Sequence, residues 1–388
     1  MENRLWKKEY VYAVFVLFCL HIGPYLLLPV ITVYGKMLSG SDAQAGMMAS
    51  VFALSGLFAR FLSAWLLDRF PVRKVLLYFT GLMGAASFLY IFSSLYWQAF
   101  VLRGIQGLAY GITCTAMSTY IVNILDPQNR LEGIGYSALT GNLANAVCPA
   151  VSYLLLGEHV DRFQFLFIAV FVSAVFAFLS VLFLKPAKQH EIQKNRTLQG
   201  TDSLNGVLYL LAVPFLMWLC ISFSSSPVSA FLSLFALEKG FGGIGFYFTV
   251  NMAGIIVSRL AMGRIVNSLG SRLTAVIMIV LIAMSLFFIA NMSALWQLYA
   301  LAFPFGFANG CLMPLINTLL VNSLPSEKSG LANAVFFAAG DAGFILGPTI
   351  WGIVARSTSY HTVFLTASVI CAAAVVIPLA AGKELFKN

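Results

Sequence analysis

The sequence predicts an all-α integral membrane protein whose twelve transmembrane helices form two pseudo-symmetric six-helix bundles. Three observations predict this class. First, 60% of the 388 residues are hydrophobic and only 10% are charged, which leaves too few polar side chains to cover a soluble protein of this size. Second, apolar runs recur along the chain, each of the roughly twenty residues needed to cross a hydrocarbon core. Third, the two halves of the chain share motifs at a fixed spacing.

The internal repeat places matching residues 199 positions apart. Arg60 in the segment RFLSAWLLDRFPVR corresponds to Arg259 (259 − 60 = 199) in the segment RLAMGRIVNSLGSR. The other matching pairs are Asp68 and Asn267, Arg73 and Arg272, Gly141 and Gly340, Asn142 and Asp341, and Pro149 and Pro348. Parallel repeats of this kind are typical of proteins that move solutes by rocking two bundles about a site near the bilayer midplane.

Twelve apolar segments account for the predicted membrane spans. They are residues 10–34, 45–68, 74–94, 98–122, 134–156, 163–184, 207–236, 242–266, 272–291, 295–320, 329–355 and 360–381. The first run is too long for the apolar region of a signal peptide, so we expect this span to be retained. The longest polar segment, 186–206, predicts a cytoplasmic linker between an N-terminal bundle of residues 1–185 and a C-terminal bundle of residues 207–388. A short surface helix is the alternative for this segment.

The basic residues predict the orientation, because lysines and arginines of short loops stay on the cytoplasmic side. Placing the N-terminus inside puts most loop lysines and arginines in the cytoplasm. Those on the outer side are Lys36, Arg162, Lys239 and Arg356. We therefore expect a multi-pass protein of the cell membrane with both termini cytoplasmic, embedded in the lipid bilayer. This bias also accounts for the net charge of +9 without a nucleic-acid partner.

Two local motifs resemble signatures of one transporter family. The loop after the second span reads LLDRFPVRK over residues 66–74, and the fourth span contains RGIQGLA over residues 103–109. Both resemble motifs of the major facilitator superfamily of secondary transporters, and the resemblance extends over essentially the whole chain. Ala64 and Pro71 stand where the loop motif usually has glycines, and in its second copy Asn267 replaces the aspartate.

The resemblance implies a gating role for the loop motif, in which a cytoplasmic patch holds one of two access states. We carry this role to Asp68, Arg69 and Arg73, and to Asn267 and Arg272 of the second copy. A carboxylate such as that of Asp68 is also stabilised beside the unpaired N–H groups of a helix N-terminus. The alternative is a positive-inside topology signal with a solvated aspartate.

The glycine-rich antiporter signature of the superfamily lies in an unusual place. The fifth span keeps only Pro149 of this pattern, whereas the eleventh span contains Gly343, Gly347, Pro348 and Gly352. Small residues followed by proline permit close helix packing and a hinge. Within the superfamily the chain looks most similar to the drug- and sugar-efflux permeases, a group that includes exporters of opine metallophores.

Ionisable residues inside a span are costly and are candidates for function. Asp341 is the only carboxylate among them and lies about 17 Å into its span, close to the midplane. Burial favours its neutral form and contact with water or arginine favours the charged form, so we predict that Asp341 is the coupling proton site. The alternative is a permanently paired structural aspartate. His21, at a similar depth, either binds substrate or proton or is a packing residue.

Arginines and polar side chains complete the predicted substrate cavity. The family motif gives Arg103 a part in proton transfer or substrate contact. Arg60 and Arg259 form a symmetric pair that either attracts anionic substrate groups or snorkels to the headgroups. The polar cavity candidates beside prolines are Ser224 in the seventh span and Asn309 and Asn317 in the tenth.

We therefore predict a proton-coupled exporter of small amphipathic or zwitterionic molecules (a drug, a sugar or an opine metallophore) that works by alternating access as a monomer. One alternative is a proton-coupled importer of an organic anion or sugar. A transporter-like membrane sensor is the alternative from another class. The sequence has no paired carboxylates and no H-E-x-x-H motif, so it does not predict an enzyme. Its six cysteines lie in spans without a histidine at ligand spacing, so we expect no metal and no cofactor.

Overall fold

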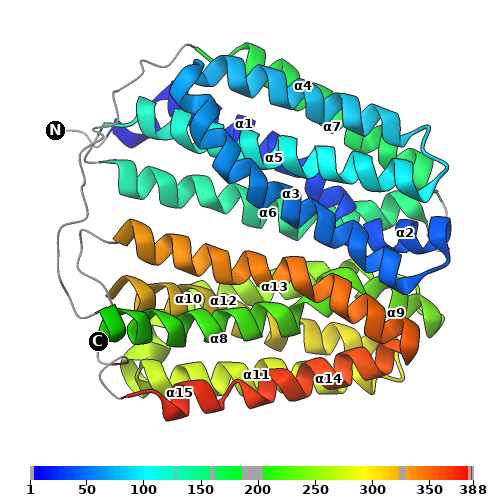
Figure 1. The fold of residues 1–388 in the computed structure, drawn as a ribbon, viewed down its shortest axis with the longest axis vertical. Coiled ribbons are helices and arrows are strands. Elements are labelled where there is room, and N and C mark those ends of the chain that lie inside the picture. The colour runs from blue at the N-terminus through cyan, green and yellow to red at the C-terminus, as the bar shows by residue number, and fades with distance from the viewer. Residues whose placement is uncertain are drawn as a thin grey trace. The chain divides into compact units, whose positions relative to one another are not determined.

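The computed structural model describes residues 4–126, 129–157, 162–185, 204–322, 329–382 and 386, and all regular structure in these ranges is helical. The helices of the first half are η1 (Arg4–Trp6), α1 (Lys8–Leu27), α2 (Ile31–Ser39), α3 (Asp42–Arg69), α4 (Val72–Tyr90), α5 (Tyr96–Ile124), α6 (Arg130–Leu156) and α7 (Phe163–Leu182). Those of the second half are α8 (Leu204–Ala230), α9 (Leu232–Glu238), α10 (Gly245–Leu269), α11 (Ser271–Ala290), α12 (Leu295–Asn322), α13 (Ser329–Ser357), α14 (Tyr360–Ala373) and α15 (Val376–Ala380) (Figure 1).

Each predicted span falls on one of these helices or on a consecutive pair. Among the described residues, 11 helical segments are long and apolar enough to cross a membrane. The remaining predicted span lies in α5, a helix of 29 residues whose apolar sequence is interrupted by Arg103 and Gln106. The prediction of an all-α membrane protein is therefore confirmed. The predicted linker falls mostly on residues 186–203, which lie outside the described part of the chain, and α8 begins at Leu204.

The first and seventh spans each contain a kink, and the two kinks have the same geometry. Val30, which precedes α2, has φ −125° and ψ −7°, and Phe231, which precedes α9, has φ −121° and ψ −7°. Each kink follows a proline whose carbonyl accepts the last regular hydrogen bond, Pro24 in α1 and Pro227 in α8. A proline has no N–H to donate and crowds the turn that precedes it, so Pro29, directly before Val30, ends the regular hydrogen bonding of α1, whereas Pro24 lies inside the unbroken helix.

The chain divides into two compact units that share one scheme of helix packing. The first comprises Met1–Gly40 and Val51–Arg196, and the second comprises Ser41–Ser50 and Thr197–Asn388. In the first unit, α1 packs against α5, α6 and α7, and α4 packs against α5 and α7. In the second unit, α8 packs against α12, α13 and α14, and α11 packs against α12 and α14. The same pairing scheme in both units is the structural counterpart of the sequence repeat.

Glycines permit a very close approach of α5 to α3, and of α12 to α10. A Cβ added at Gly107 would lie 2.5 Å from the Phe52 carbonyl oxygen and 3.0 Å from the Phe52 Cα. A Cβ added at Gly306, 199 residues later, would meet the backbone of Asn251, whose carbonyl carbon would be 2.8 Å away. Small residues that let two backbones touch are a recurring means of packing membrane helices, because lipid supplies no hydrophobic force between them.

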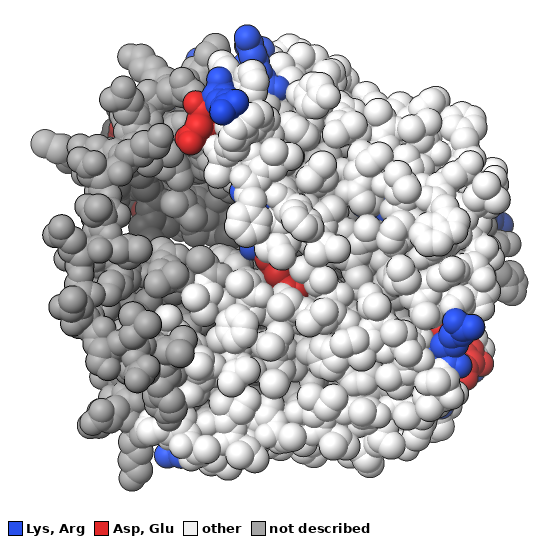
Figure 2. All heavy atoms as spheres, in the orientation of Figure 1, with Lys and Arg blue, Asp and Glu red and all other residues white. Residues whose placement is uncertain are grey.

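The outer surface is largely apolar, as a lipid environment requires. Leu154 on α6 is 81% exposed and Leu260 on α10 is 79% exposed. Figure 2 shows a face on which Lys, Arg, Asp and Glu occupy only a few small areas among uncharged side chains. Such a surface would be unfavourable in water and is stable against acyl chains.

Candidate functional site

The predicted cavity residues are divided between the two units. The first unit holds His21 on α1, Arg60 on α3 and Arg103 on α5. The second unit holds Ser224 on α8, Arg259 on α10, Asn309 and Asn317 on α12, and Asp341 on α13.

His21 takes part in a hydrogen-bonded group of aromatic side chains. Its Nδ1 lies 2.7 Å from the Tyr110 hydroxyl oxygen of α5. Tyr110 also hydrogen-bonds to Tyr25, which lies one turn after His21, and the His21 and Tyr25 rings are 5.8 Å apart. Gly141 of α6 borders the imidazole, since a Cβ there would lie 3.5 Å from the His21 Nε2. An imidazole bound to a hydroxyl in this way can accept or donate a proton.

Arg103 is fully buried and is held by two neighbours. Its Nη1 donates to the Gln106 Oε1 at 2.6 Å, and its Cζ lies 4.1 Å from the centroid of the Phe52 ring. The Phe52 ring in turn stacks on Tyr110, with a centroid separation of 5.6 Å. Arg103 and His21, far apart in the sequence, are therefore connected through two aromatic rings inside the first unit.

The two arginines of the repeat both lie on exposed positions of their helices. Arg60 is exposed on α3 and Arg259 is exposed on α10. The Arg259 Nη2 lies 3.7 Å from the Met313 Sδ of α12. Their exposure within their own units makes both guanidinium groups accessible to a ligand or to lipid headgroups, the two alternatives that the sequence leaves open.

Asp341 lies on α13 where this helix packs closely on α8. Its side chain is half-buried, and the carboxyl oxygen Oδ2 is buried. The preceding residue, Gly340, touches Trp218, because a Cβ there would lie 2.7 Å from the Trp218 Nε1. The Trp218 ring stacks on Phe336 at 5.1 Å. This carboxylate is thus carried by a tightly packed helix pair.

Polar side chains of α8 and α12 meet beside this pair. The Ser225 hydroxyl donates to the Asn309 Oδ1 at 3.4 Å, and the Asn309 Nδ2 donates to the Phe305 carbonyl at 2.9 Å. The Ser224 Oγ and the Asn317 Oδ1 are buried without a hydrogen-bond partner among the described residues. Buried polar atoms of this kind are able to bind the polar groups of a ligand.

The repeated arginine of the loop motif has equivalent partners in both units. The Arg73 Nη2 donates to the Leu182 carbonyl at 2.7 Å, at the end of α7. Arg272 donates from Nε to the Pro378 carbonyl at 2.7 Å and from Nη2 to the Leu379 carbonyl in α15. The last carbonyls of a helix have no partner within the helix, so each arginine caps the final helix of its own unit.

The other predicted gating residues are exposed within their units. Asp68, Arg69 and Asn267 are all exposed, and the Arg69 Cζ lies 4.4 Å from the centroid of the Trp65 ring. The gating role of these three residues stays a prediction.

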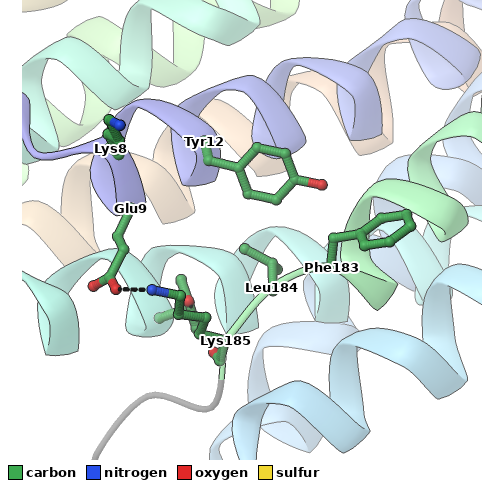
Figure 3. Close-up of a pocket in the computed structure, with 7 residues that line it drawn as sticks. Lys8, Glu9, Tyr12, Phe183, Leu184 and Lys185 are labelled. Carbon is green, nitrogen blue, oxygen red and sulfur yellow. Dashed lines mark hydrogen bonds and ion pairs between the residues drawn. The ribbon is translucent and has the colours of Figure 1, made fainter.

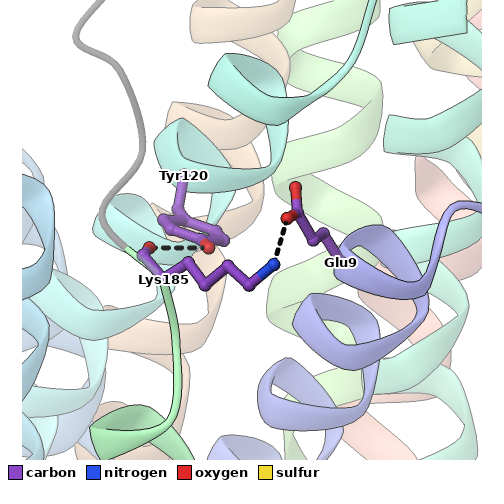
Figure 4. Close-up of polar contacts among 3 residues, drawn as sticks. All are labelled: Glu9, Tyr120 and Lys185. Carbon is purple, nitrogen blue, oxygen red and sulfur yellow. Dashed lines mark hydrogen bonds and ion pairs between the residues drawn. The ribbon is translucent and has the colours of Figure 1, made fainter.

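A pocket of about 560 Å³ lies at the end of the first unit where α1 begins and α7 ends. It is lined by Lys8, Glu9, Tyr12, Tyr120, Phe183, Leu184 and Lys185 (Figure 3). The Lys185 Nζ lies 2.8 Å from the Glu9 Oε1, and the Tyr120 hydroxyl donates to the Lys185 carbonyl at 2.9 Å (Figure 4). No predicted site residue lines this pocket. The contacts of Lys185 with Glu9 and Tyr120 connect the end of α7 to α1 and α5.

The sequence predictions missed Tyr25 and Tyr110, which contact His21. The spacing of these tyrosines in the sequence could have identified them. Tyr25 follows His21 by four residues and Tyr110 follows Arg103 by seven, so each lies on the same helix face as a predicted site residue. Among the described residues, no three His, Cys, Asp or Glu side chains gather as a metal site requires.

Comparison with known proteins gives consistent matches along the chain. A family model described as the Major Facilitator Superfamily matches residues 13–244 and 219–384. The Multidrug resistance protein MdtG of Citrobacter koseri is 25% identical over 386 residues, covering 94% of this chain and 93% of that protein. The protein of the same name from Escherichia fergusonii is 24% identical, covering 93% of this chain and 91% of that protein.

Solved structures support the same fold. The nucleoside transporter NupG has a TM-score of 0.79 at 15% identity and covers 98% of this chain and 100% of its own. A bacterial homologue of the human lysosomal transporter Spinster has a TM-score of 0.73 at 12% identity and covers 100% of this chain and 97% of its own. At these identities the likeness concerns the fold alone.

Proposed function

Because the chain belongs to the Major Facilitator Superfamily of membrane transporters, which are not enzymes, we propose that it is a proton-coupled exporter of small amphipathic or zwitterionic molecules that works by alternating access. The observation that carries the export proposal is the similarity to proteins named as multidrug resistance proteins, which extends over 94% of the chain. The packing scheme that the two units share supports a mechanism in which two bundles alternate between access states.

In this proposal Asp341 is the proton site. It is carried by the packed pair of α8 and α13, so its environment depends on the position of that pair. A carboxyl group in an apolar environment binds a proton, and it releases the proton when water or a cation reaches it. Alternation between these environments would couple proton movement to substrate movement.

We assign substrate contact to the polar atoms that the two units bury. These are the His21 imidazole with its tyrosine partners, and the serine and asparagine groups of α8 and α12. Arg103, which is fully buried, would take part in proton coupling, and the exposed arginines Arg60 and Arg259 would attract acidic groups of a substrate. We further propose a monomer in the cell membrane with both termini in the cytoplasm, in accordance with the distribution of the loop lysines and arginines.

Inverted membrane vesicles that contain the protein test this proposal. Respiration acidifies such vesicles, and a fluorescent amine reports the pH gradient. An exporter coupled to protons should accumulate substrate in the vesicle lumen, and addition of a fluorescent cationic drug should partly collapse the gradient. Vesicles without the protein are the control.

Two outcomes would contradict export. If preloaded vesicles release substrate and protons together from their lumen, the protein has the alternative function of a proton-coupled importer. A complete lack of substrate movement across a panel of cations, zwitterions and organic anions would favour the membrane sensor.

A further inference from the structure

We propose that the first unit contains a binding site for a small monovalent anion of halide size, formed by Arg103 and Gln106 of α5 beside the Phe52 ring of α3. This inference does not depend on the direction of transport or on the coupling ion. It rests on the hydrogen-bond donors, the charge and the packing at this one place in the fold.

The donors at this place outnumber their acceptors. Arg103 and Gln106 are each 0% exposed, and the bond from the Arg103 Nη1 to the Gln106 Oε1 uses the one side-chain acceptor of the pair. The Arg103 Nε, the Arg103 Nη2 and the Gln106 Nε2 are buried without a partner among the described residues. A guanidinium has five N–H groups and no acceptor, so the missing partner must be an acceptor.

The charge of Arg103 has no carboxylate partner within the described first unit. Glu9 pairs with Lys185 and Asp126 pairs with Lys7, in both cases at the surface. The remaining described carboxylates of this unit, Asp68 and Glu132, are exposed at helix ends. Contact with the Phe52 ring compensates only part of the cost of burying a cation. A negative charge is therefore the ligand that this site would bind best.

The second unit shows that the helix pair does not need this charge to pack. At the matching positions, 199 residues later, Asn251 stands for Phe52 and Ala302 stands for Arg103. There the Asn251 Nδ2 donates to the Ala302 carbonyl at 3.3 Å, and Gly306 keeps the same close approach as Gly107. A packed interface of this type is thus built without an ionised group, which favours a ligand-binding role for Arg103.

The packing around Arg103 limits the size of the ligand. Gly107, one turn after Arg103, touches the Phe52 backbone, and Gly111 lies so close to α3 that a Cβ there would be 2.6 Å from the Ala59 Cβ. Helices this close leave no room for a large organic acid unless they separate. A halide is a single weakly hydrated atom, and guanidinium is itself weakly hydrated, so the pair desolvates easily.

Thermal unfolding of the purified full chain in detergent tests the site. Sodium chloride is exchanged for sodium gluconate at constant ionic strength and pH. A third series contains sodium formate, which tests whether a small carboxylate binds in place of a halide. The wild type should unfold at a temperature that rises with the logarithm of chloride concentration, as expected when a ligand binds only the folded state. Radiolabelled chloride in equilibrium dialysis should saturate near one ion per chain.

Gln106→Glu is the decisive variant, because it places a carboxylate three residues from Arg103 and should keep the fold. It should weaken chloride binding by about tenfold or more, since it replaces the anion with an internal one. Arg356→Gln removes an exposed arginine of the second unit and should keep the full response to chloride.

Three results would overturn the proposal. The first is equal unfolding temperatures in chloride, formate and gluconate. The second is an undiminished chloride response in Gln106→Glu. The third is a response that is lost equally in Arg356→Gln, which would show that chloride acts through general screening.

Discussion

The close contact between α5 and α3 leads to a quantitative prediction for Gly107→Ala. The new Cβ would lie 2.5 Å from the Phe52 carbonyl oxygen and 3.0 Å from the Phe52 Cα, and both atoms belong to a helix backbone that cannot rotate away. Overpacking of this kind costs about 1–3 kcal/mol. Alanine is better than glycine in a helix by about 0.5–1 kcal/mol, which offsets part of the loss. The net loss therefore lies between about 0 and 2.5 kcal/mol, and relative to an alanine without the overlap the loss is the full cost of about 1–3 kcal/mol.

Gly135→Ala is the matched control. Gly135 lies in α6, and a Cβ there would have no neighbour within 4 Å, so only the gain in helix propensity applies. The free energy of unfolding of the two variants is measured in mixed micelles at increasing denaturant. Gly306→Ala repeats the test in the second unit, where the Cβ would meet the Asn251 backbone. If Gly107→Ala is as stable as Gly135→Ala, the close approach of the two helices is wrong.

The remaining predictions concern capping, the histidine cluster and the ion pair at the pocket. Arg73→Gln removes a charged donor from the Leu182 carbonyl and should lower the free energy of unfolding by about 1.5–3 kcal/mol. The control is Lys74→Gln, at the exposed neighbouring position, which should change this free energy little. Equal effects of the two substitutions would contradict the capping role. Tyr110→Phe removes the hydroxyl bound to His21 and should slow efflux about fivefold, the equivalent of one neutral hydrogen bond; unchanged efflux would make the contact structural. Lys185→Gln breaks an exposed ion pair and should cost less than about 1 kcal/mol of unfolding free energy, and a larger loss would contradict this reading.

Much of the fold was predictable because hydrophobic runs and the repeat are properties of the sequence itself. All twelve predicted spans fall on helices, and the spacing of 199 residues that joins Arg60 to Arg259 reappears in the packing of Gly107 and Gly306. The kinks at Val30 and Phe231 were not predicted, because prolines occur in several spans and only some of these helices end soon after one.

The candidate site was predictable in its residues but not in their contacts. An ionisable residue in a span is visible in the sequence, so His21, Arg103 and Asp341 were identified. The partners of Arg73 and Arg272 are backbone carbonyls, which carry no signature in the sequence. The burial of Arg103 without a carboxylate partner in the described first unit depends on how its helices pack, so only the structure reveals it.

In the proposed mechanism, substrate and proton compete for the transporter through Asp341. The most direct measurement is proton release from purified, detergent-solubilised protein on addition of a substrate found in the vesicle assay, in the wild type and Asp341→Asn. The substitution is conservative, because asparagine already occupies the matching position, Asn142, of the first unit. We expect substrate-dependent proton release in the wild type, and we expect this release to disappear in the variant while substrate binding is retained. Undiminished release from the variant, or binding without release in the wild type, would contradict this mechanism.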